Sequence, residues 1–331
     1  MKKIWPIFKV SVSLLLIAVI LTKVKVSRVA EVLAGINFWL LLVLLLISFL
    51  LILISCLKWK LFVADEARVV KLHVLMKYYV IGYFFNNVLP SNIGGDVART
   101  YLLGKNIKSQ SESFSSVFWE RFTGFIALVP IAFFAALYSR ELLRTPAISI
   151  SIVLMSGSLI AVGVCSVWEK PKELLESVIL RRLRLTGSFL QKLERLYSSV
   201  HMVKYKRREL AKAMLYSLLF QGMAIVNTLV CCWSIGVYPD VVDVAATVPI
   251  IMMVSTIPIS IGGLGLWEGS FAYFFSLIGI SPVDAVTVAL VLRCKNLLLG
   301  LCGGGLLLLA ERAGEGNKPL VAGSRIKALS K

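Results

Sequence analysis

Long apolar stretches separated by short charged segments run along most of the 331-residue chain. An α-helix needs about 20 apolar residues to cross a bilayer. Six stretches are of this length: Ile4–Thr22, Phe38–Leu57, Phe114–Leu137, Ile148–Trp168, Ala213–Gly236 and Ala285–Ala310. The pattern predicts an all-α polytopic membrane protein.

Two further apolar regions, Tyr78–Leu103 and Val244–Ile280, are interrupted by the same phrase, Pro-x-x-Ile-Gly-Gly. Pro and Gly break helices, and freed backbone groups at membrane depth are tolerated only where protein or a water-filled cavity covers them. Matching interruptions in the two halves of a chain point to the binding site of a transporter. The predicted breaks are formed by Pro90, Gly94 and Gly95 in the first region and by Pro258, Gly262 and Gly263 in the second.

The charges between the apolar stretches predict the topology, because Lys and Arg accumulate in cytoplasmic loops. Placing both termini in the cytoplasm gives six full transmembrane helices and two re-entrant hairpins, one for each interrupted region. If these regions are full crossings instead, the chain has eight spans. In the six-span scheme three spans separate the hairpins, which therefore enter from opposite faces, and the two halves form an inverted repeat.

The strongest cytoplasmic marker is the segment 169–213, which carries 12 basic and 5 acidic residues. Its apolar positions keep helical spacing, which predicts basic amphipathic helices on the inner leaflet, with a solvated helical hairpin as the alternative. We therefore expect one transmembrane domain over residues 1–313 and a disordered cytoplasmic tail over residues 314–331. The formal net charge of +18 is explained by such loops, so nucleic-acid binding is not expected.

Ionisable residues inside predicted membrane regions are costly, at roughly 2.5–3.5 kcal/mol each at a helix centre, and they usually mark functional sites. Arginine binds phosphate through a rigid fork of donors, and a helix N-terminus at a Gly-Gly break attracts anions as well. A central site for a phosphate-containing headgroup is one interpretation, and internal pairing that only holds the helices together is the other. The residues concerned are Asp96, Arg99, Glu120, Arg121, Glu268 and Arg293.

Cofactor and metal chemistry is not expected. The six cysteines lie in or beside apolar stretches without zinc-type spacing, and His73 and His201 are isolated. No nucleophile, metal cluster or nucleotide-binding motif is evident, so an enzyme that uses Glu120 or Glu268 as a base on a lipid phosphate is a weak alternative.

Three separated motifs resemble the lysylphosphatidylglycerol synthase transmembrane region, a family of flippase-like domains also called UPF0104. They are Asn87–Arg99 (NVLPSNIGGDVAR), Trp119-Glu120-Arg121, and Pro258–Gly269 (PISIGGLGLWEG) with the later Arg293. The family usually has Gly-x-Arg-Glu in the last motif, and here Trp267 occupies the arginine position.

The resemblance covers nearly the whole chain and implies a multi-pass protein of a bacterial-type inner membrane, without the C-terminal aminoacyl-transfer domain of the best-known relatives. It implies movement of an aminoacyl-phospholipid, a glycolipid or a polyprenyl-phosphate lipid between leaflets. A non-catalytic membrane partner of a lipid or glycan assembly complex is the alternative. Membrane lipids are the expected ligands, lipid or glycan biosynthesis enzymes are candidate partners, and the oligomeric state is left open.

Overall fold

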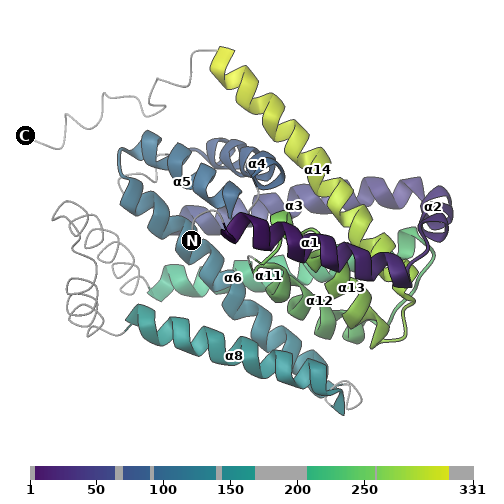
Figure 1. The fold of residues 1–331 in the computed structure, drawn as a ribbon. Coiled ribbons are helices and arrows are strands. Elements are labelled where there is room, and N and C mark those ends of the chain that lie inside the picture. The colour runs from purple at the N-terminus through teal and green to yellow at the C-terminus, as the bar shows by residue number, and fades with distance from the viewer. Residues whose placement is uncertain are drawn as a thin grey trace, which may run out of the picture.

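The computed structural model describes residues 4–63, 70–89, 93–138, 144–167, 207–257 and 259–312. Within these ranges the regular secondary structure is helical, with no strands (Figure 1). The α-helices are α1 (Ile4–Lys23), α2 (Val26–Ala34), α3 (Phe38–Phe62), α4 (Leu72–Val88), α5 (Gly94–Ile107), α6 (Gln110–Tyr138), α8 (Pro146–Val167), α11 (Arg207–Ser234), α12 (Val241–Ser255), α13 (Leu266–Ser276) and α14 (Pro282–Arg312); a 3₁₀-helix, η3 (Ile261–Gly263), precedes α13.

Four of the described helices, α3, α6, α11 and α14, are long and apolar enough to cross a membrane. A fifth candidate is the pair α1–α2, which is bent by 77°. The stretch Pro146–Gly157 of α8 and the whole of α12 are apolar but shorter. The six predicted spans coincide with α1, α3, α6, α8, α11 and α14. The chain is therefore a multi-pass helical membrane protein, and the number of full crossings stays a prediction.

Both interrupted regions fold as two short helices on either side of a break. In the first region α4 and α5 have 17 and 14 residues, and in the second α12 and α13 have 15 and 11. At 1.5 Å per residue these helices are roughly 16–26 Å long, shorter than the ~30 Å hydrocarbon core. Gly262 and Gly263 have φ values of 56° and 71°, which a side chain would disfavour. Pro90 and Pro258 lie outside the described residues.

The two interrupted regions pack against helices of the opposite half of the chain. The first helix of the first region, α4, lies against α14, and the first helix of the second region, α12, lies against α6. The contact between α4 and α14 is very close, because a Cβ added at Gly303 would lie 2.1 Å from the Val80 carbonyl oxygen. Each half is thus joined to the other through its broken helix.

The structure corrects one predicted boundary. Helix α3 continues beyond Leu57 to Phe62, so Lys58 lies inside a helix rather than at the start of a cytoplasmic loop. Helix α11 begins at Arg207, so the last residues of the predicted 169–213 segment form the start of a long helix. The rest of that segment and the predicted tail, 314–331, lie outside the described residues.

Candidate functional site

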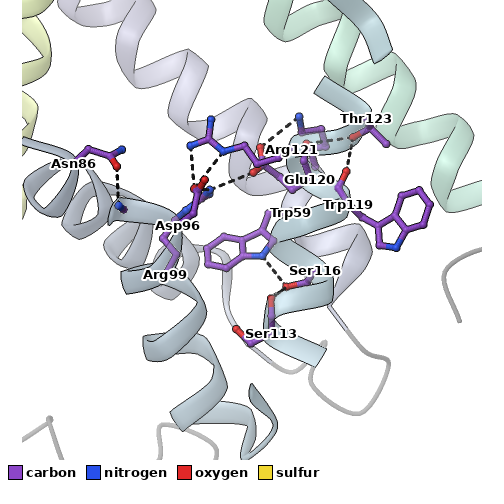
Figure 2. Close-up of polar contacts among 12 residues, drawn as sticks. Trp59, Asn86, Asp96, Arg99, Ser113, Ser116, Trp119, Glu120, Arg121 and Thr123 are labelled. Atoms are coloured by element: carbon purple, nitrogen blue, oxygen red, sulfur yellow. Dashed lines mark hydrogen bonds and ion pairs between the residues drawn. The ribbon is translucent and has the colours of Figure 1, made fainter. Parts of the chain in front are cut away.

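Glu120 of α6 is the centre of a buried ionic cluster, which we call the first cluster. Its Oε1 atom lies 3.3 Å from Nζ of Lys58 on α3. Its Oε2 atom lies 3.3 Å from Nη2 of Arg99 on α5 (Figure 2). All three side chains are almost completely buried. One carboxylate therefore bridges two cations that come from different helices.

Asp96 extends the first cluster to a third cation. Its Oδ1 atom accepts hydrogen bonds from Nη2 of Arg99 and, at 3.2 and 2.9 Å, from Nε and Nη2 of Arg121 (Figure 2). Asp96 and Arg99 lie three residues apart on one face of α5, and Arg121 directly follows Glu120 on α6. The two helices after the first break are thus tied together by alternating acidic and basic groups.

Arg99 lies between two aromatic rings in the interior. Its guanidinium carbon is 4.3 Å from the ring centre of Tyr79 and 5.1 Å from that of Trp59. Such cation–π contacts contribute about 2 kcal/mol or more where the cation is desolvated. The indole of Trp59 is itself fixed by a 2.9 Å hydrogen bond from Nε1 to Oγ of Ser116 (Figure 2).

The first cluster contains more positive than negative charge. Lys58, Arg99 and Arg121 face two carboxylates, those of Asp96 and Glu120. The Nη1 atom of Arg99 is buried and has no hydrogen-bond partner among the described residues. Arg121 is the accessible member, with 41% of its side chain exposed. The arrangement can accept an additional anionic oxygen, and Arg121 is where it would enter.

The break before α5 is held by Asn86 of α4. Its Oδ1 atom accepts a 2.6 Å hydrogen bond from the amide of Gly95 (Figure 2). A Cβ at Gly95 would lie only 2.4 Å from the carbonyl oxygen of Gly82, so the close approach of α4 and α5 requires glycine here. Because Asn86 already occupies the Gly95 amide, that amide is not available to bind an anion in this conformation.

The second cluster consists of Glu268 on α13, Arg293 on α14, and the backbone of the second break. Nε of Arg293 donates to Oε1 of Glu268, and its Nη1 and Nη2 atoms donate to the carbonyl oxygens of Gly262 and Gly263 at 3.3 and 3.1 Å. The other carboxylate oxygen of Glu268 accepts a 2.9 Å hydrogen bond from the amide of Gly265. Here the break presents the carbonyl oxygens of Gly262 and Gly263 to an arginine, and its Gly265 amide is occupied by the carboxylate of Glu268.

The two clusters repeat one arrangement. Asp96 and Arg121 are 25 residues apart in sequence, and so are Glu268 and Arg293. In each case the carboxylate lies on the helix that follows a Gly-Gly break, and the arginine lies on the next long helix. All six predicted site residues are therefore brought into ion pairs, four in the first cluster and two in the second.

Most of the chain is similar in sequence to one family of known proteins. The lysylphosphatidylglycerol synthase TM region matches residues 7–304 of the chain. The chain belongs to this family. A UPF0104 membrane protein from Pyrococcus horikoshii is 23% identical over 321 residues, which cover 90% of this chain and 94% of the relative. No solved structure matches the chain significantly.

Trp267 occupies the position at which the resemblance led us to expect an arginine. Its Nε1 atom donates a 3.1 Å hydrogen bond to the carbonyl oxygen of Ala289 on α14, and its ring packs against Phe271. In this family member the side chain therefore joins α13 to α14 through a neutral contact. The only cation beside Glu268 in the described site is Arg293.

The sequence analysis missed Lys58 as a member of the first cluster. The predicted span ended at Leu57, yet the apolar residues Trp59, Leu61 and Phe62 follow directly, and they are the signal that could have extended it. A second buried lysine, Lys295 on α14, donates to Oδ1 of Asn227 on α11 at 2.9 Å and is outside both clusters. Among the described residues, no group of three His, Cys, Asp or Glu side chains is placed to hold a metal ion.

Proposed function

We propose that this protein moves a lipid with a phosphate-containing headgroup between the two leaflets of a membrane, without covalent chemistry. The observation that carries the proposal is the repeated carboxylate–arginine pair at a helix break, 25 residues apart in both halves. Intramembrane ionisable groups are expensive and usually functional. Discontinuous helices with such groups, one in each half, are characteristic of carrier sites at the repeat interface.

Arg121 is the first contact that we propose for the headgroup. It is the exposed arginine of the first cluster, and its partner Asp96 is shared with Arg99. A phosphate that binds Arg121 would compete with Asp96, which keeps its second cation, so the exchange leaves no buried carboxylate unpaired. The excess positive charge of the first cluster favours such an anion.

The packing of the broken helices supports movement of one half against the other. Because α4 contacts α14 and α12 contacts α6, a displacement at one break is transmitted to the arginine-bearing helix of the other half. We propose that the ion pairs of the two clusters block the route of the lipid headgroup in the described conformation. During transport the pairs of one cluster would break while those of the other stay formed, and then the reverse. The acyl chains remain in the surrounding lipid throughout this cycle.

The family suggests the class of lipid. Aminoacyl-phospholipids, glycolipids and polyprenyl-phosphate lipids carry a phosphate that suits the arginine fork. The proposed setting is a bacterial-type inner membrane with both termini in the cytoplasm.

The test is leaflet exchange of fluorescent lipids in proteoliposomes, with anionic, aminoacylated, glycosylated and polyprenyl-phosphate headgroups. Arg121→Lys keeps the charge and loses the bidentate fork, so we expect a fall in exchange of at least tenfold with little change in thermal stability. Glu268→Gln and Arg293→Ala are expected to reduce exchange as well. Lys212→Gln, at an exposed position near the start of α11, is the matched control and should retain the wild-type rate.

Wild-type exchange in Arg121→Lys, Glu268→Gln and Arg293→Ala would contradict the site assignment. Exchange of no lipid by folded protein would contradict the carrier and favour a non-catalytic partner of an assembly complex. Conversion of a lipid by the purified protein in detergent would favour the enzyme instead, because detergent abolishes leaflets but not catalysis.

A further inference from the structure

The end of α1 and the whole of α2 form a bent unit that we call the elbow. The two helices meet at an angle of 77°. Val29 on α2 is buried, Val26 and Leu33 are exposed, and Arg28 and Glu31 form an exposed ion pair 3.1 Å long. A short helix with separate apolar and charged positions, bent away from a span, is typical of a segment that lies in the membrane interface.

A cavity of about 250 Å³ lies between the elbow and helices α13 and α14. Its wall is hydrocarbon, because Glu268 and Arg293 contribute their aliphatic parts while their charged groups contact each other and the backbone. The described residues around it include Ile20, Leu21 and Val26 of the elbow region, Leu264 before α13, and Leu290 and Arg293 of α14.

Close contacts fix the two ends of the cavity. At one end α1 is held against the second break, where Oγ of Ser13 accepts a 3.0 Å hydrogen bond from the amide of Ile261. At the other end Val24, Val29 and Val286 pack together in a small buried core. The lining residues of α1, α2, α13 and α14 lie between these contacts, and Arg293 is among them.

The rim of the cavity consists of exposed apolar side chains. Leu21, Val26 and Leu264 are 55%, 64% and 42% exposed. In a membrane protein these side chains face lipid, so the cavity is accessible to hydrocarbon from the bilayer. Engineered apolar cavities of about 150 Å³ stay free of water and bind benzene, and this one is larger. A segment of a lipid acyl chain is therefore the occupant that its size and wall favour.

The charged residues at the elbow indicate the charge of the lipid headgroup that would bind there. Lys23, Lys25 and Arg28 lie within six residues, with Glu31 as the one acidic residue of α2. The predicted topology places this segment on the external side, where the positive-inside rule does not account for basic residues. Exposed basic side chains beside an interfacial helix attract the headgroups of anionic lipids.

We propose that the cavity is a binding site for one acyl chain of an anionic phospholipid whose phosphate lies beside Lys25 and Arg28. The chain extends from the elbow toward Leu290 and ends near the aliphatic part of Arg293. This site is distinct from the headgroup path through the first cluster and does not require lipid movement.

The test is photo-crosslinking of the full chain in nanodiscs with phosphatidylglycerol that carries a diazirine near the end of one acyl chain. We expect labelled peptides from α1, α13 and α14 around the cavity. Leu290→Trp and Ile20→Trp fill the cavity from opposite walls and should each reduce this labelling at least fivefold. Leu298→Trp, at an exposed position of α14 outside the cavity, is the matched control and should leave it unchanged.

The headgroup is tested with phosphatidylcholine that carries the same chain. The wild type should prefer phosphatidylglycerol, and the double variant Lys25→Gln, Arg28→Gln should lose that preference while the chain is still labelled. Equal labelling of lipid-facing positions on α3, or labelling unaffected by both cavity-filling variants in folded protein, would overturn the proposal. Leaflet exchange measured on the same samples separates the two proposals, since the site can be occupied in a protein that moves no lipid.

Discussion

Glu120 shows how much one buried carboxylate contributes to this protein. It pairs with Lys58 and Arg99, and all three side chains are almost inaccessible. Removing one partner of a buried ion pair leaves an uncompensated charge and costs about 3–5 kcal/mol. The residue therefore belongs to the stability of the fold as well as to the proposed path.

We predict that Glu120→Gln lowers the free energy of unfolding by about 3–5 kcal/mol, because Lys58 loses its carboxylate and Arg99 keeps only Asp96. The measurement is reversible unfolding in detergent micelles, followed by the fluorescence of Trp59 and the other tryptophans.

Adding Lys58→Met to Glu120→Gln provides the internal check, because it removes the cation that Glu120→Gln leaves without a carboxylate. The double variant should be more stable than the sum of the single effects predicts, by about 0.5–3 kcal/mol. Strict additivity would contradict the direct pairing of Lys58 with Glu120.

At the scale of helices, the contact between α4 and α14 joins the first broken region to the opposite half. Gly303 makes this contact possible, since its Cβ position lies 2.1 Å from a backbone oxygen of Val80. Small residues that let backbones approach are the usual means of helix association in membranes, where lipid weakens any hydrophobic drive.

We predict that Gly303→Ala destabilises the protein by about 1–3 kcal/mol, because α14 must move away from the backbone of α4. Gly305→Ala is the matched control two residues further along α14, where an added Cβ meets nothing within 4 Å. It should be as stable as the wild type or slightly more stable, since alanine favours a helix. Thermal unfolding of both variants tests this, and equal behaviour would disprove the close contact.

At the scale of the whole molecule, the open question is how many times the chain crosses the membrane. In the six-span scheme the turn before α6 at Lys108 is cytoplasmic and the loop before α12 at Tyr238 is external. If each interrupted region crossed the membrane once, these two positions would exchange sides. The short helices of both regions favour the first scheme.

We predict that a membrane-impermeant thiol reagent added to intact cells labels Tyr238→Cys and not Lys108→Cys. Tyr238 is 77% exposed, so its replacement should not disturb packing. The exposed thiols of Cys294 and Cys302 are first replaced by serine. Labelling of Lys108→Cys alone would establish the eight-span alternative.

Local features of the sequence determined the class of this protein, most of its helices and the members of its candidate site. The length of an apolar stretch and the presence of Pro or Gly affect the backbone locally. The six predicted spans and both breaks can therefore be predicted without any knowledge of packing. Charges such as Asp96, Arg121, Glu268 and Arg293 stand out because a bilayer makes them expensive.

Only the tertiary structure decided which of these charges meet. Lys58 and Glu120 come from different helices, and their contact depends on how α3 and α6 pack rather than on any local pattern. The elbow cavity likewise arises because α1, held at Ser13, packs against α13, while α2 packs against α14 far along the chain. Such contacts depend on long-range packing, and apolar periodicity constrains that packing only loosely because lipid and protein offer similar surroundings to an apolar side chain.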